Sequence, residues 1–334
     1  VGPPRLMRAE GWPYTRTPPQ APFMALHAPS GRWQLGLTLA LVTAALWATL
    51  PVALKIALEA LDPWTLTWAR FAFAALVVGA WLAWRGGWSR FRGLGGGAWL
   101  LLALAALTLI GNYVFYLLGL HYTTPANAQL LIQAAPLLMA LGGIVVFREH
   151  YNGWQWAGLL AIVGGLGLFF ADQLARPAPA GSRYVLGSGL VLLGAVVWAV
   201  YALAQKQLLR QLSSTAILGF IYLVAALLLW PLAQPGKLAT LDATHWIALA
   251  YCALNTLGAY GAFAEALDHW EASRVSVVLA LTPLLTVATV ELVHRLAPRL
   301  VQPEQIAWMG WAGAALVVAG SATSAFMRSA QPTE

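Results

Sequence analysis

Charged residues are scarce in this chain. Only 9% of its 334 residues are Asp, Glu, Lys or Arg, whereas 60% are hydrophobic. Soluble domains carry about 25% charged residues, so this composition does not give a globule of this size a polar surface. We therefore expect a protein that spans a membrane several times. The net charge of +7 fits basic residues gathered in cytoplasmic loops better than a nucleic-acid partner.

Cysteine, lysine and histidine are also rare. The single cysteine excludes an intrachain disulfide. The three lysines lie in no G-x-x-x-x-G-K-[ST] loop, which excludes ATP-driven pumping by this chain. The six histidines are scattered and form no His-Glu-x-x-His set. We therefore expect a protein that is not an enzyme and uses no cofactor and no metal, with an intramembrane enzyme as the rival class.

The hydrophobic residues form long runs, which are separated by charged residues, Pro and Gly. A membrane-spanning helix needs about 20 apolar residues, and ten runs approach that length. They predict an all-α polytopic fold with ten transmembrane helices, near residues 35–58, 64–84, 98–120, 125–147, 153–171, 187–209, 214–233, 244–267, 271–294 and 304–327.

Lys and Arg set the predicted orientation. With the N-terminus inside, 12 of them fall on the cytoplasmic side and 5 in outer loops, so the positive-inside rule places both termini in the cytoplasm. The predicted organisation is a disordered cytoplasmic tail at 1–31, a first five-helix repeat at 32–171, an external linker at 172–186, a second five-helix repeat at 187–327 and a cytoplasmic tail at 328–334.

The same sparse pattern occurs in both halves. Trp47 and Lys55 are matched by Trp198 and Lys206, both at an offset of 151 residues. Around the fourth and ninth spans, Pro136 is matched by Pro283 at an offset of 147. Because each half has an odd number of spans, the two repeats are expected to be inverted in the membrane. Inverted repeats place a binding site near the midplane, where the halves meet.

Several segments resemble one known family. They are WARFAFAAL around Arg70, GLHYTTPANAQLLIQAAPLL followed by FRE at 147–149, QWAGLLAIVGGLGL at 155–168 and EALDHWEASRVSVVLALTPLL at 265–285. Their order resembles the drug/metabolite transporter superfamily, EamA type. The resemblance implies a ten-helix exporter of small metabolites in a bacterial inner membrane, commonly of amino acids. The sequence departs from the family pattern in VHRLAPRL at the end of the ninth span, where a Gly-Glu pair is usual.

Aromatic and amide residues inside the spans are the candidate cavity lining. Trp47 and Trp198 lie near the middle of their spans, where an indole N–H needs a partner or a wet cavity. Polar stripes inside spans line a pathway or bond helices together, and a packing role is the alternative for both tryptophans. The predicted cavity residues are Trp47, Asn112, Tyr113, Tyr116, Gln129, Gln133, Trp198, Tyr201 and Asn255.

Three cations inside the spans are candidates for a charged gate or for binding a carboxylate. They are Lys55, Arg70 and Lys206. The alternatives are that the lysines extend to the membrane interface and that Arg70 binds loop carbonyls. Glu265 and Glu291 are candidates for proton coupling, because an ionisable group in a span is costly. For Glu291, an ion pair with Arg295 at i+4 is the alternative.

Pro136 and Pro283 are expected to kink their spans and act as hinges. The predicted function is secondary-active export of amino acids with apolar or aromatic side chains, by alternating access around a central cavity. Other small amphipathic compounds or drugs are the alternative cargo. The expected partners are the small-molecule substrate, membrane lipid and protons as a coupling ion.

Overall fold

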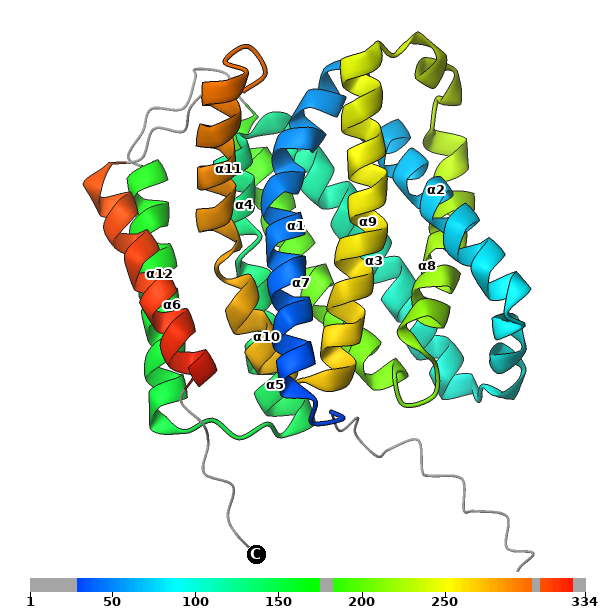
Figure 1. Ribbon diagram of the computed structural model, residues 1–334, viewed down its shortest axis with the longest axis horizontal. Helices are drawn as coiled ribbons and strands as arrows, with labels where there is room; N and C mark the ends of the chain where they lie inside the picture. Colours follow the sequence, from blue (N-terminus) through cyan, green and yellow to red (C-terminus); the bar gives the residue numbers. More distant parts are fainter. Residues whose placement is uncertain (1–28, 175–182, 302–306, 327–334) are drawn as a thin grey trace, which may run out of the picture.

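The computed structural model describes residues 29–174, 183–301 and 307–326, and all regular structure within these ranges is helical (Figure 1). The α-helices are α1 (Trp33–Ala60), α2 (Pro63–Trp84), α3 (Gly96–Tyr122), α4 (Pro125–Leu131), α5 (Ala134–Phe147), α6 (Gly153–Leu174), α7 (Tyr184–Leu208), α8 (Ser214–Leu229), α9 (Ala243–His269), α10 (Ala272–Leu279), α11 (Thr282–Leu296) and α12 (Trp308–Phe326). Short 3-10 turns lie at Gly87–Gly93, Trp230–Leu232 and Pro235–Thr240.

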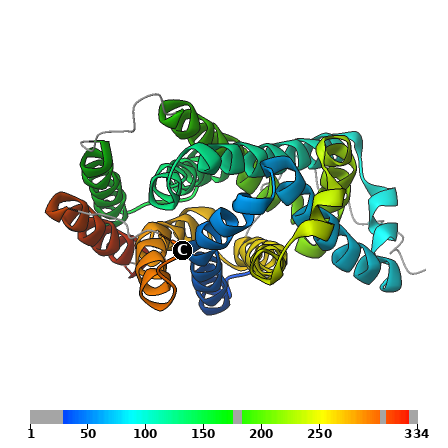
Figure 2. The ribbon, with the colours of Figure 1, turned by 90° about the horizontal axis from the view of Figure 1, so that it is seen from above.

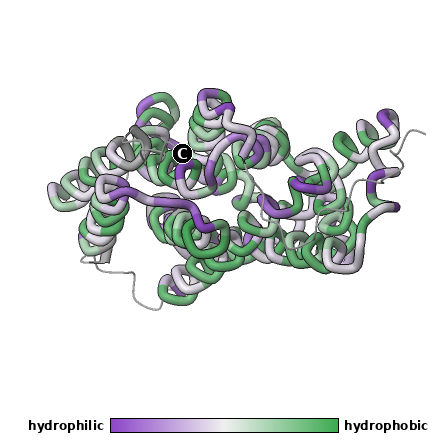
Figure 3. The backbone as a smooth tube through the Cα atoms, turned by 90° about the horizontal axis from the view of Figure 1, so that it is seen from below, coloured by the Kyte–Doolittle hydropathy of each residue, from purple (hydrophilic) through white to green (hydrophobic). Residues whose placement is uncertain are grey.

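Length and hydropathy make this a polytopic membrane protein, as the sequence predicts. Seven helical segments within the described ranges are long and apolar enough to cross a membrane, and three shorter apolar helices accompany them. In Figure 3 the helices carry mostly hydrophobic and neutral colours, whereas the connection between α5 and α6 is hydrophilic. The count of ten spans stays a prediction.

Two of the predicted spans are interrupted. The fourth divides into α4 and α5 at Ile132 and Gln133, and the ninth divides into α10 and α11 at Ala280 and Leu281. A proline follows each break within four residues, at Pro136 and Pro283, and proline removes the N–H that would bond the carbonyl four residues earlier. The predicted kinks are therefore present, and their role as hinges stays a prediction.

The helix packing in one half of the chain has a counterpart in the other. α1 packs on α9 as α7 packs on α3, and α1 contacts α11 as α7 contacts α5. α2 with α8, and α6 with α12, form the remaining principal pairs. In Figure 2 these two pairs lie at opposite ends of an elongated outline.

α1 and α7 run in opposite directions. Lys55, near the end of α1, donates to the carbonyl of Thr123 at the end of α3. Gly187, at the start of α7, lies against the same residue, and an added Cβ there would come within 2.8 Å of the Thr123 side chain. The end of α1 and the start of α7 therefore share one end of the molecule, which we call the Lys55 end. The opposite end, where α7 finishes, is the Lys206 end.

The linker is shorter than its predicted bounds, and most of the two predicted tails lies outside the residues that the structure describes. Residues 172–174 continue α6 and residues 184–186 already belong to α7. The predicted tail at 1–31 is described only from Pro29, and the predicted tail at 328–334 lies outside the described residues.

Candidate functional site

A cavity lies where the two halves of the chain meet. The volume open to the centres of water-sized spheres is about 80 Å³, enough for several waters. The lining comes from both halves and comprises Trp47, Leu50, Leu54, Arg70, Asn112, Tyr113, Tyr116, Leu117, Gln129, Ile132, Gln133, Ala135, Trp198, Tyr260, Leu279 and Thr282.

Most of the predicted cavity residues lie in this lining, and two do not. Tyr201 packs against Tyr260 and Phe263, with ring centroids 6.0 and 6.4 Å away. Asn255 lies elsewhere on α9 and donates to the Leu46 carbonyl at 2.6 Å. Their role as substrate-cavity residues stays a prediction.

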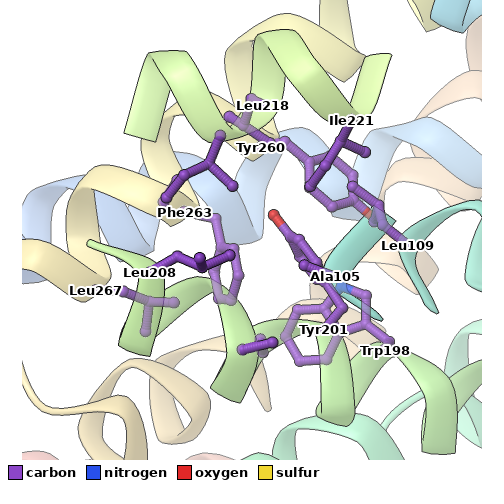
Figure 4. Packing of buried hydrophobic residues seen from close by; sticks show 14 of the residues in the cluster. Ala105, Leu109, Trp198, Tyr201, Leu208, Leu218, Ile221, Tyr260, Phe263 and Leu267 are labelled. Carbon is purple, nitrogen blue, oxygen red and sulfur yellow. The ribbon is translucent and has the colours of Figure 1, made fainter. Parts of the chain in front are cut away.

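Four rings from three helices pack together beside the cavity, and we call them the aromatic layer: Trp47, Trp198, Tyr260 and Phe263. The first three line the cavity, and Phe263 packs against Trp47 and Trp198. The Trp47 ring lies 5.5 Å from that of Trp198 and 5.2 Å from that of Tyr260, both nearly edge to face. The Trp198 ring lies 5.0 Å from that of Phe263. Edge-to-face and tilted pairs at these distances stabilise one another beyond simple burial. Figure 4 shows Trp198, Tyr260 and Phe263 among leucine and isoleucine side chains.

The amide residues of the lining connect helices. Asn112 donates to the Gly194 carbonyl at 3.1 Å and accepts from the Tyr260 hydroxyl at 3.3 Å. The Tyr116 hydroxyl donates to Gln129 at 3.0 Å. These polar side chains therefore both line the cavity and bond neighbouring helices, and their role in a transport pathway stays a prediction.

Gln133 connects the two broken helices. Its amide donates at 3.0 Å to the carbonyl of Leu279, and the Thr282 hydroxyl donates to the same carbonyl at 2.5 Å. This carbonyl lies four residues before Pro283, which has no N–H to offer it. Each break thus contributes to a polar contact across the cavity wall between the halves.

Arg70 is the one of the three predicted cations that reaches the cavity. Its side chain is only 2% exposed. The Nε donates to the Thr256 hydroxyl at 3.1 Å, and the guanidinium carbon lies 4.5 Å from the Tyr113 ring centroid. Among the residues that the structure describes, no carboxylate forms an ion pair with Arg70. A guanidinium carries five N–H donors, and the one on Nε of Arg70 binds Thr256.

Lys55 donates hydrogen bonds to backbone carbonyls. Its Nζ donates to the carbonyls of Leu120 and Thr123 at 3.2 and 3.1 Å. These carbonyls lie at the C-terminal end of α3, where a cation interacts favourably with the helix dipole.

Lys206 is bound in a buried cluster at the opposite end. Its Nζ lies 2.6 Å from Glu149 Oε1, and the two side chains are 1% and 8% exposed. Glu149 also accepts from the backbone N–H groups of Ala272 and Ser273, each at 3.0 Å. We call these four residues the Glu149–Lys206 cluster, and it ties the α5–α6 connection to α7 and to the start of α10.

Glu149 lies outside the helices, in the connection after α5. Burial opposes its charge, but the Lys206 ammonium and the hydrogen bonds from Ser273 outweigh that effect and hold the pKa of the carboxyl below its usual range. The Glu149 side chain is therefore a carboxylate at neutral pH.

Glu265 and Glu291 lie away from the cavity, and both side chains are 45% exposed. Glu265 accepts from the Ser214 hydroxyl, one turn before α9 ends. Glu291 accepts from Arg295 at 2.6 Å, which is the ion pair given as the alternative. Within the described ranges, one group of side chains could bind a metal ion: Glu265, Asp268 and His269, whose ligand atoms lie within 4.8 Å of one another.

Several contacts of this region were not predicted from the sequence. Tyr260 lines the cavity, Thr256 binds Arg70, and Glu149 neutralises Lys206. The sequence contains a signal for Glu149, because FRE at 147–149 places a carboxylate directly after an apolar run. It contains none for the pairing of Glu149 with Lys206, which lies 57 residues away.

The model of the EamA-like transporter family matches residues 34–171 and 185–326. The chain belongs to the EamA-like transporter family. The resemblance seen in the sequence is therefore confirmed, and this EamA-like chain is a membrane transporter.

Two relatives of this EamA-like transporter match most of its length. The protein named uncharacterized inner membrane transporter YhbE from Escherichia coli is 36% identical over 294 residues, covering 87% of this chain and 91% of that protein. An uncharacterized transporter from Haemophilus influenzae is 35% identical over 291 residues, with 87% and 94% covered. A solved crystal structure that is 22% identical superposes with a TM-score of 0.65 over 89% of this chain and 97% of its own, which shows the shared fold.

Proposed function

We propose that this transporter is a secondary-active exporter of small metabolites that carry a carboxylate, most of all amino acids with apolar or aromatic side chains. The observation that supports this substrate class is Arg70, a buried guanidinium in the cavity wall that no described carboxylate neutralises. Arginine binds a carboxylate through two parallel hydrogen bonds. The other two predicted cations have partners within the protein, because Lys55 binds two backbone carbonyls and Lys206 binds the Glu149 carboxylate.

The remainder of the lining fits the side chain of such a substrate. Trp47, Trp198 and Tyr260 present ring faces and edges beside Leu50 and the other aliphatic residues. Aromatic rings pack on other rings in offset or edge-to-face geometry, so an apolar or aromatic side chain would pack against the aromatic layer while its carboxylate binds Arg70.

The mechanism we propose is alternating access between two inverted five-helix repeats. The matched helix contacts of the two halves and the opposite directions of α1 and α7 support it. We place the protein in the bacterial inner membrane with both termini in the cytoplasm, following the positive-inside rule. α1 begins and α12 ends at the same end of the molecule (Figure 1), in keeping with termini on one side.

Proton coupling through Glu265 or Glu291 stays a prediction. Both carboxylates are about half exposed and have partners, so a structural role is the better-supported reading. Substitution of each by Gln, followed by transport with and without a proton gradient, decides between the two roles.

The test of the substrate class is efflux from proteoliposomes loaded with a labelled amino-acid mixture. We expect the wild-type protein to release a few apolar or aromatic amino acids. Arg70→Met should reduce that release at least tenfold, because a charge-assisted hydrogen bond contributes roughly 1.5–3 kcal/mol. Arg70→Lys should recover only part of it, because a lysine cannot bind a carboxylate through a planar fork.

Arg295→Met is the matched control, since Arg295 is 74% exposed and lies far along α11 from the cavity. Vesicles loaded instead with uncharged amphipathic compounds test the alternative cargo. Release of those compounds at a rate that Arg70→Met leaves unchanged would favour that cargo and refute the carboxylate site.

A further inference from the structure

Two polar side chains of α7 are buried without a partner. Tyr201 and Gln205 are both fully buried, and neither the Tyr201 hydroxyl nor either amide atom of Gln205 has a hydrogen-bond partner in the described protein. Nearly all buried polar groups in folded proteins are bonded. The Tyr201 hydroxyl and the two amide atoms of Gln205 therefore indicate hydrogen bonds that are made in another conformation of the protein.

The two residues lie on one face of α7, between the aromatic layer and the Lys206 end. Trp198, Tyr201 and Gln205 are spaced i, i+3 and i+7, which places them on one side of a helix. Trp198 lines the cavity, so this face of α7 starts at the cavity and continues away from it. Lys206, the next residue, belongs to the Glu149–Lys206 cluster.

The repeat gives this face a counterpart on α1 that lines the cavity. At the offset of 151 residues that relates Trp47 to Trp198, Leu50 corresponds to Tyr201 and Leu54 to Gln205. Leu50 and Leu54 both line the cavity. On α7 the same positions are covered, and Tyr201 packs against Tyr260 and Phe263 (Figure 4). The α1 face is thus part of the cavity wall, whereas the equivalent α7 face is covered by other side chains.

The Glu149–Lys206 cluster closes the same end. Glu149 binds Lys206 on α7 and the first N–H groups of α10 at once. Separating α7 from α10 requires these contacts to break. Gly143 lies within this packing, since an added Cβ would come within 2.6 Å of Glu149 Oε2.

We propose that Tyr201 and Gln205 form a second substrate subsite, which opens toward the Lys206 end when the Glu149–Lys206 cluster separates. A hydroxyl and a carboxamide both donate and accept hydrogen bonds, so the subsite suits the charged amino and carboxylate groups of an amino acid. The path then has apolar side chains on α1, at Leu50 and Leu54, and polar side chains at the equivalent positions of α7. This proposal rests on the transport function proposed above.

The test is cysteine labelling with a charged, membrane-impermeant thiol reagent on purified full-length protein. The one native cysteine, Cys252, is buried and is first replaced by Ala. Leu50→Cys reports the cavity and should react readily. Gln205→Cys should react slowly, and adding Glu149→Gln should raise its rate at least tenfold. An unchanged Gln205→Cys rate beside a reactive Leu50→Cys overturns the proposal.

A second variant separates a subsite from a simple packing defect. Gln205→Leu gives α7 the residue that the equivalent position on α1 already has, and removes two unsatisfied polar atoms. We expect the melting temperature to be equal or higher and substrate release to fall at least tenfold. Release at the wild-type rate overturns the proposal. If the wild-type protein releases no amino acid, the proposed function fails, while the labelling result still decides whether Gln205 becomes accessible.

Discussion

The Lys206 ammonium is buried against Glu149, so its removal should be costly. Lys206→Met leaves the Glu149 carboxylate with the N–H donors of Ala272 and Ser273 and without its cation. Removing one partner of a buried ion pair costs about 3–5 kcal/mol. Because two hydrogen bonds remain, we expect the lower end of that range. A loss of about 3 kcal/mol corresponds to a roughly 100-fold shift in the folding equilibrium.

The assay is reversible unfolding of the purified protein in detergent, run as a double-mutant cycle. The cycle compares Lys206→Met, Glu149→Gln and the double variant, and it isolates the energy of the pair from other effects of each substitution. Arg295→Met is the control, because its ion pair with Glu291 is exposed and should contribute no more than about 1 kcal/mol.

A coupling energy as small as that of the control pair would refute this reasoning. It would mean that Lys206 and Glu149 stay hydrated, and the description of their cluster as a desolvated link between α7 and α10 would be wrong.

Three further predictions use the same geometry. The pKa of Glu149 is lowered in the folded protein, so its stabilisation should be complete above about pH 4.3 and fall away as the pH drops through the lower folded-state pKa. An acid transition unchanged by Glu149→Gln would contradict this. Trp47→Ala and Trp198→Ala should each reduce transport at least tenfold at normal membrane levels, because each removes a ring of the aromatic layer that lines the cavity. Full activity in both variants would return the two residues to a packing role. Gly143→Ala should lower the melting temperature by crowding Glu149, whereas Gly167→Ala, with nothing within 4 Å, should not; equal thermal scans would count against this packing.

The helices were predictable because a membrane imposes a simple rule on sequence. Each helical run lies within four residues of its predicted bounds, since a span must be apolar over its whole length. Pro136 and Pro283 also predicted where two spans are interrupted, because the missing N–H is a local property of the residue.

The contacts of the site were less predictable. The sequence made Lys55, Arg70 and Lys206 alike candidates for binding a carboxylate. Of these three, only Arg70 lines the cavity, while Lys55 binds carbonyls and Lys206 binds Glu149. Glu265 was assigned to the interior of its span and lies near the end of α9, half exposed. Side-chain direction and burial depend on neighbouring helices that are far away in the sequence.

The sequence by itself determined the membrane class, the helical fold, the family and the duplicated Trp and Lys positions, because hydropathy and repeat spacing are properties of the chain. Only the tertiary structure decided that Trp47 packs against Trp198, that Glu149 binds Lys206 and the start of α10, and that Leu50 and Leu54 line the cavity while Tyr201 and Gln205 do not. The physical reason is that the two halves resemble one another in sequence but are packed unequally, and unequal packing arises from contacts between residues that are distant in the chain.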